Sequence, residues 1–71
     1  MRAAVVRNIA YGILLHHYNR RMTAGEIARN SNGQVTRKQV HHALRNFARV
    51  SRQFAIFPDP AANRIYYSIY P

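Results

Sequence analysis

Apolar residues recur with helical spacing over the first third of the chain. Alanine, leucine and β-branched residues fill this segment without an intervening proline, which predicts one long helix over about residues 3–22. The apolar positions form two arcs, separated by asparagines on one side and an arginine on the other. The first arc holds Val5, Val6, Ile9, Ala10 and Ile13, and the second holds Ala4, Tyr11, Leu15, Tyr18 and Met22.

A helix with two apolar faces is expected to be buried on both of them. One arc can pack on the rest of the domain, and the other needs either the C-terminal end of the chain or a second subunit. The pattern leaves both explanations open. The homodimer interface expected under the second explanation consists of Tyr11, Leu15, Tyr18 and Met22.

Two capping-box motifs mark the starts of two further helices. Thr23 is followed three residues later by Glu26, and Thr36 in the same way by Gln39. In such a pair each side chain satisfies a backbone N–H of the first helical turn, so helices are predicted over about residues 24–30 and 37–52. The intervening NSNGQV contains asparagines and Gly33, which tolerate positive φ. Two capped helices joined by a turn of this kind predict a helix-turn-helix.

The third predicted helix has two contrasting faces. One side carries a core-type apolar stripe, formed by Val40, Ala43, Leu44, Phe47 and Val50. The opposite side carries a row about 17 Å long of cationic or titratable side chains, formed by Lys38, His42, Arg45 and Arg49, with His41 and Arg52 on its flank. Solvated helix faces usually mix both signs of charge. Because this helix has no acidic residue, the row favours contact with a polyanion.

After this helix the apolar period shortens to two. Residues 53–57 and 64–70 alternate as β-strands do, and PDPAAN between them predicts a loop of about six residues. The hairpin closes the core, and it can also act as a wing that lays Arg64 beside a phosphate strand or the minor groove. The expected fold class is therefore α+β, with three helices followed by a two-stranded hairpin over about residues 53–70.

Composition sets further limits on fold and function. Seventy-one residues make one small domain, 1–71, with little core to spare. The absence of cysteine excludes disulfides and thiolate metal sites. Eleven Lys and Arg against two acids give a formal charge of +9, which points to nucleic acid or an anionic membrane surface. The longest apolar run is too short to span a bilayer, so we expect a cytoplasmic protein with no membrane role.

Catalytic and metal chemistry lack the residues they need. Besides the C-terminus, the carboxylates are Glu26, expected as a cap, and Asp59 in the loop, so no general acid and base pair is available. The histidine pairs 16–17 and 41–42 diverge by about 100° on a helix, whereas metal ligands need i, i+3 or i+4 spacing. We expect no enzymatic activity, cofactor, metal or small-molecule substrate.

The segments TAGEIA, TRKQVHHALRNF and AIFPDPAANRIYYSI together resemble the winged helix-turn-helix family of DNA-binding proteins, and the resemblance covers nearly the whole chain. They look like those of small bacterial and phage transcription regulators. The resemblance implies that the third helix enters the major groove and that the hairpin flanks it as a wing. The expected function is a transcriptional regulator that binds double-stranded DNA, associated with the nucleoid or with host-cell DNA.

Under this hypothesis the contacts divide into two groups. Residues near the start of an inserted helix reach base edges, and these are Arg37, Lys38, His41, His42 and Arg45. The expected phosphate contacts are Arg29, Arg49, Arg52 and Arg64. Two alternatives remain open. The fold can serve as a protein-interaction module held by a protein partner, or the charge can serve nonspecific or architectural binding of nucleic acid, including RNA.

Overall fold

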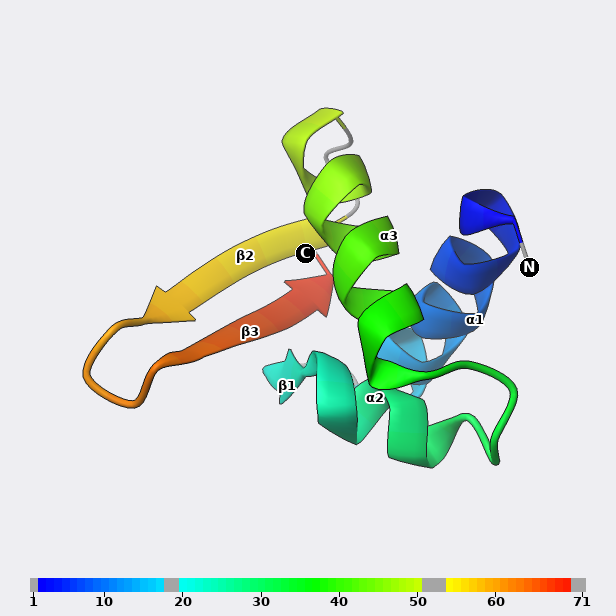
Figure 1. The fold of residues 1–71 in the computed structure, drawn as a ribbon, viewed down its shortest axis with the longest axis horizontal. Helices are drawn as coiled ribbons and strands as arrows, with labels where there is room; N and C mark the ends of the chain where they lie inside the picture. Colours follow the sequence, from blue (N-terminus) through cyan, green and yellow to red (C-terminus); the bar gives the residue numbers. More distant parts are fainter. Residues whose placement is uncertain (1, 18–19, 51–53, 70–71) are drawn as a thin grey trace.

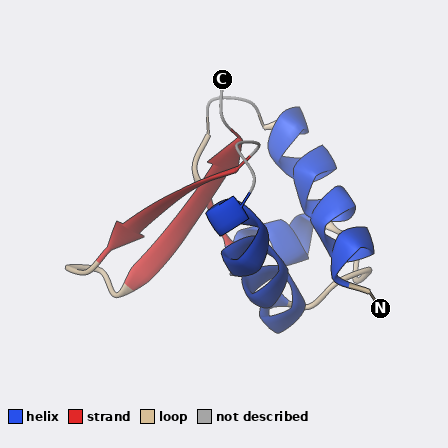
Figure 2. Cartoon of the chain, turned by 90° about the horizontal axis from the view of Figure 1, so that it is seen from above, coloured by secondary structure: helices blue, strands red, loops and turns tan. Residues whose placement is uncertain are grey.

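The computed structural model of the chain is a small α+β domain with three helices and a three-stranded antiparallel sheet. It describes residues 2–17, 20–50 and 54–69, and within the last helix it describes side chains through Phe47. The elements in chain order are α1 (Ala3–His16), β1 (Met22–Thr23), α2 (Ala24–Asn30), α3 (Arg37–Val50), β2 (Phe54–Asp59) and β3 (Arg64–Ile69). The helices gather on one side, and the β2–β3 hairpin extends from them as an arm (Figures 1 and 2).

Helix α1 is shorter than its apolar pattern predicts. It ends at His16, where the N–H of His17 donates to the carbonyl of Ile13. The chain resumes as β1, in which Met22 pairs with Tyr67 and Thr23 with Tyr66. The prediction of a helix through residue 22 is therefore wrong, and the third strand was not predicted. Because Met22 is 1% exposed within the core, its assignment to a subunit interface is also wrong.

Four of the five residues of the first predicted arc of α1 face the core: Val6 and Ala10 are buried, and Ile9 and Ile13 pack against the cluster. The fully buried residues of α1 form one stripe. Its members lie at i, i+4 and i+8 and are Val6, Ala10 and Leu14. Leu14 belongs to neither predicted arc, whereas Val5 is 45% exposed and Leu15 is 53% exposed.

The intrachain explanation holds for Tyr11. Its ring meets the ring of Phe54 edge to face, with centroids 5.7 Å apart, so the start of the hairpin covers this side of α1. Of the four predicted interface residues, Tyr18 lies outside the described part of the chain. Leu15 is the described member whose side chain is largely free of its own domain.

The predicted second and third helices and the turn between them are confirmed. Both halves of the Thr23–Glu26 capping box are formed. At the start of α3 the Gln39 N–H donates to Thr36 Oγ1 over 3.1 Å, and the Thr36 N–H donates to Gln39 Oε1 over 2.9 Å. Asn32 and Gly33 adopt φ of 55° and 82°, as the reversal of the chain requires. These local interactions fix where α3 begins.

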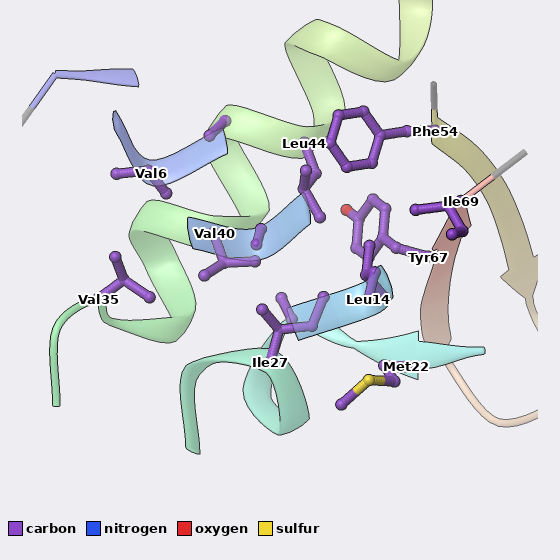
Figure 3. Packing of buried hydrophobic residues seen from close by; sticks show 13 residues of the cluster. Val6, Leu14, Met22, Ile27, Val35, Val40, Leu44, Phe54, Tyr67 and Ile69 are labelled. Carbon is purple, nitrogen blue, oxygen red and sulfur yellow. The ribbon is translucent and has the colours of Figure 1, made fainter. Parts of the chain in front are cut away.

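The apolar stripe of α3 lies at the centre of the core. Val40, Ala43 and Leu44 are buried, and Phe47 packs against them at the edge. Figure 3 shows Val40 and Leu44 of α3 beside α1, with Leu44 next to the ring of Tyr67 of β3. The described helix ends at Val50, and the last two residues of the predicted helix, 51 and 52, lie outside the described residues. Burial of the stripe turns the opposite face of α3 to solvent.

The hairpin has a tighter turn than predicted. Pro58 pairs with Ile65 and Asp59 with Arg64, so the loop has the four residues 60–63 rather than about six. Pro58 is tolerated within the ladder because β2 lies at the edge of the β1-β3-β2 sheet, where a missing N–H leaves no partner unsatisfied. Asn63 takes φ of 52°, and Asp59 Oδ1 accepts from the N–H of Ala62.

Candidate nucleic-acid interface

The outward face of α3 is cationic along the part whose side chains are described. Lys38, His42 and Arg45 are all exposed, as the helical period predicted. Helix α3 contains no acidic residue, and the ion pair found among the described residues joins Arg20 to Glu26 elsewhere. The fourth member of the predicted row, Arg49, has a side chain outside the described part. Three charged or titratable groups are thus presented to solvent without local neutralisation.

A second cationic cluster lies in a groove beside this face. The groove has a volume of about 660 Å³ and lies between the start of α2, the start of α3 and the end of the hairpin. It is lined by Arg29 of α2, Arg37 of α3 and Arg64 of β3. The stem of Arg37 lies along Gly25, since a Cβ placed on that glycine would be 3.6 Å from the arginine Cδ. Three elements therefore each contribute an arginine to the lining of one groove.

Glu26 is the acidic residue that lines the groove. Its Oε1 accepts from the N–H and the hydroxyl of Thr23, both over 3.2 Å, and its Oε2 lies 3.4 Å from Arg20. The carboxylate is thus engaged by the cap of α2 and by an exposed ion pair. Because three arginines and one carboxylate line the groove, it keeps an excess of positive charge.

Two residues that line the groove, one from β3 and one from α3, are joined by a hydrogen bond. The hydroxyl of Tyr67 lies 3.2 Å from Nδ1 of His41, and both residues line the groove. Tyr67 is 1% exposed. Burial raises the pKa of its phenol, and the positive charge of Arg45 acts in the opposite direction. His41 is thereby tied to the core, whereas the sequence had placed it on the flank of the exposed row.

The predicted contact residues form two groups in the structure. Lys38, His42 and Arg45 share the outward face of α3, and Arg29, Arg37, His41 and Arg64 share the groove. Arg52 lies outside the described residues. Arg37 and His41 were predicted with the base-contacting set, but the fold brings them beside Arg29 and Arg64.

Two interactions, one at the groove and one on the outer face of the sheet, were not predicted from the sequence. One is the hydrogen bond between Tyr67 and His41. The sequence places the Tyr67 hydroxyl on the inward face of a strand, and buried tyrosines usually find a polar partner, so a partner could have been expected but not identified. The other is Arg21, whose guanidinium lies 3.7 Å above the ring of Phe57. Phe57 pairs with Tyr66 and so faces away from Tyr67 and the core. Arg21 therefore adds charge to the outer face of the sheet.

The hairpin itself carries little charge. Arg64 and Asp59 stand opposite each other at the end of the ladder, and beside them the exposed side chains are apolar, with Ile56 and Ile65 more than a third exposed. A hairpin of this kind can lie against a groove of DNA through its backbone and Arg64. It offers less electrostatic attraction than α3 does.

No group of three His, Cys, Asp or Glu side chains in residues 2–17, 20–50 and 54–69 is arranged to hold a metal ion. None of the described helices is both long and apolar enough to cross a membrane.

Compared with models of protein families, with curated proteins and with solved structures, the chain gives no match.

Proposed function

We propose that the chain is a winged helix-turn-helix protein that binds double-stranded DNA and regulates transcription. In this proposal α3 enters the major groove and the β2–β3 hairpin is the flanking wing. The observation that carries it is the division of α3 into two faces. Burial of Val40 and Leu44 holds the helix rigidly on the core, so the exposed side chains opposite are presented in a fixed orientation.

The dimensions of α3 suit this role. Its 14 residues make a rod about 21 Å long, and a major groove about 12 Å wide admits an α-helix. Lys38, His42 and Arg45 would then face base edges, with Arg45 able to donate two hydrogen bonds to guanine. The position of Arg37 beside Arg29 and Arg64 supports a phosphate contact for it rather than a base contact.

One observation favours a second candidate function, a protein-interaction module. The hairpin exposes Ile56 and Ile65 on one face of neighbouring strands, and a contiguous group of exposed apolar side chains can mark a partner surface. A homodimer through α1 would rest on Leu15, because Met22 and Tyr11 are used within the domain.

The deciding experiment is selection from a random-sequence duplex pool at two salt concentrations, with the retained DNA sequenced and the mass of the complex determined. A specific regulator should enrich one motif, and its half-site spacing would report a dimer. Neutralising about six phosphates should make log K fall with log salt at a slope of roughly −5. Salt-sensitive retention without enrichment would indicate an architectural binder, and no retention would rule out the proposal in favour of a protein-binding role.

Variants test whether α3 carries the contact. The double variant Lys38→Gln, Arg45→Gln should weaken duplex binding by at least about tenfold, since one good base contact is worth about 1–3 kcal/mol. A control for the loss of one positive charge is Arg21→Gln, which acts on the sheet face turned away from the core, and it is compared with Lys38→Gln and Arg45→Gln singly as well as together. Wild-type binding by a folded double variant would show that α3 is not the DNA-contacting helix.

A further inference from the structure

Tyr67 connects the hydrophobic core to the groove. Its ring is packed among buried residues of the core (Figure 3), and its hydroxyl reaches Nδ1 of His41 on α3 over 3.2 Å. Within the described part of the chain, His41 is the hydrogen-bond partner found for this hydroxyl. The bond joins a strand near the C-terminus to the helix proposed to enter DNA.

The direction of this hydrogen bond follows from what each group can donate. A phenol has one O–H to donate, whereas a neutral imidazole has one donor nitrogen and one acceptor nitrogen. If His41 donated from Nδ1, the Tyr67 proton would remain in the core without an acceptor, at the cost of an unsatisfied buried donor. If Tyr67 donates, both groups are satisfied. Nδ1 of His41 is then the acceptor, and its proton is on Nε2.

The raised pKa of Tyr67 is consistent with this direction. Burial disfavours the phenolate, and a phenol at or above the ordinary tyrosine pKa is protonated at neutral pH, so the hydroxyl can donate. Arg45 acts against this shift without reversing it. The Tyr67 hydroxyl is therefore available to hold the His41 ring in one orientation and one tautomer.

We propose that Tyr67 is a positioning residue that makes His41 an Nε2–H donor in the groove, and that the groove binds a phosphodiester group of nucleic acid. With His41 in this form, the groove offers donors from His41 and from three arginines, Arg29, Arg37 and Arg64. Glu26 is the acidic acceptor there, and its oxygens are engaged by Thr23 and Arg20. An anionic ligand composed of acceptors fits this set, and the ligand assignment rests on the proposed DNA-binding function.

The tautomer can be tested without any ligand. Long-range ¹⁵N–¹H correlation spectra of the free protein report which ring nitrogen of each histidine carries the proton. In the wild type, His41 should show a protonated Nε2 and an unprotonated Nδ1. Tyr67→Phe keeps the ring and removes the hydroxyl, so His41 should become a mixture of tautomers. The matched control is Tyr66→Phe on the opposite face of β3, which should leave the His41 signals unchanged.

Binding then tests the ligand assignment, using a fluorescein-labelled duplex and anisotropy. Tyr67→Phe should weaken binding by between about twofold and tenfold, the effect of one hydrogen bond. In a His41→Ala background the same change should have no further effect, because the hydroxyl acts through the histidine. A folded Tyr66→Phe variant should bind as the wild type does.

The outcomes separate this proposal from the DNA-binding function. A wild-type His41 protonated on Nδ1 overturns the positioning role, whatever the protein binds. Additive losses from Tyr67→Phe and His41→Ala would show that the hydroxyl does not act through the histidine and would overturn the positioning role in binding. No loss from either variant overturns the groove as the phosphodiester site. If the wild type shows the Nε2–H tautomer, Tyr67→Phe loses it and the wild type does not bind duplex, the DNA-binding function and the ligand assignment are overturned and the positioning role stands. An Nε2–H tautomer that Tyr67→Phe leaves unchanged overturns the positioning role.

Discussion

Two adjacent leucines of α1 distinguish the single buried stripe from the two-arc helix. Leu14 is 1% exposed and belongs to the core, and Leu15 is 53% exposed. Leu14→Ala and Leu15→Ala delete the same atoms from consecutive positions of the same helix, so helix propensity and chain composition are matched. Any difference in stability between the two variants therefore reports burial.

The expected costs differ severalfold. At Leu14 the substitution loses the transfer free energy of the deleted carbons and leaves a cavity within the hydrophobic core, at about 2–5 kcal/mol. At Leu15 about half of the side chain is already in water, no cavity forms, and alanine gains a few tenths of a kcal/mol in helix propensity, so the loss should stay below about 1 kcal/mol. At about 0.05–0.15 kcal/mol per residue, Leu14→Ala removes a large part of the total stability of the domain.

The assay is urea unfolding followed by circular dichroism at several protein concentrations. Leu14→Ala should lower the midpoint strongly with little change in slope, and Leu14→Val provides a milder variant if the alanine protein does not fold. For a monomer the midpoints are independent of protein concentration. A large loss for Leu15→Ala, together with a wild-type midpoint that rises with concentration, would show that this face is buried in a dimer and would refute the single-stripe reading of α1.

Three further predictions concern backbone and pH. Gly12→Ala should raise the free energy of unfolding by about 0.5–1 kcal/mol, because a Cβ there meets nothing within 4 Å, and calorimetry should show a higher melting temperature. Gly33→Ala should lower the free energy of unfolding by about 1 kcal/mol, because Gly33 has φ of 82°. The raised pKa of Tyr67 means that the folded state holds the phenol proton more tightly. Its contribution to stability is present below the ordinary tyrosine pKa of 10.0 and is lost as the pH rises through the folded value. When urea unfolding is repeated at several alkaline pH values, the free energy of unfolding should fall less steeply with pH in Tyr67→Phe than in the wild type, and Tyr66→Phe should behave as the wild type does.

The parts of the fold that the sequence predicted correctly are those determined by local interactions. The starts of α2 and α3 are encoded within four residues each, by Thr23 with Glu26 and by Thr36 with Gln39. The apolar stripe of α3 repeats over the whole helix, so its buried and exposed faces could be assigned without knowledge of its neighbours. The outward position of Lys38, His42 and Arg45 followed directly.

The errors arise where distant segments determine local structure. Strand β1 has two residues, too few to show a period, and it exists because β3 supplies its partner. The helical spacing of the apolar residues of α1 therefore continues in the sequence through Met22. Pro58 was treated as a break in the strand, yet an edge position accepts it, and edge position depends on the sheet order. The two-arc interpretation of α1 failed for a related reason. Leu14 lies between the arcs in the helical period, and contacts with distant segments bury it in the core.

The candidate site divides in the same way. Periodicity places charges on one face of one helix, but it cannot bring Arg29, Arg37 and Arg64 to a common groove, because they come from three elements separated by turns and a hairpin. The hydrogen bond from Tyr67 to His41 is also a tertiary contact. Both depend on the angle at which the hairpin leaves the core, which no local pattern in the chain encodes.

The small size of the domain explains why core and site share a residue. With 71 residues and no cysteine, stability must come from apolar packing, and Tyr67 is among its largest fully buried side chains. The same ring carries the hydroxyl that holds His41. Substitutions of Tyr67 that shrink the ring would therefore weaken packing and binding together, and a binding defect in such a variant would say nothing about the hydroxyl. Phenylalanine preserves the packed ring and removes the hydrogen bond, so the comparison of Tyr67→Phe with Tyr66→Phe isolates positioning from stability.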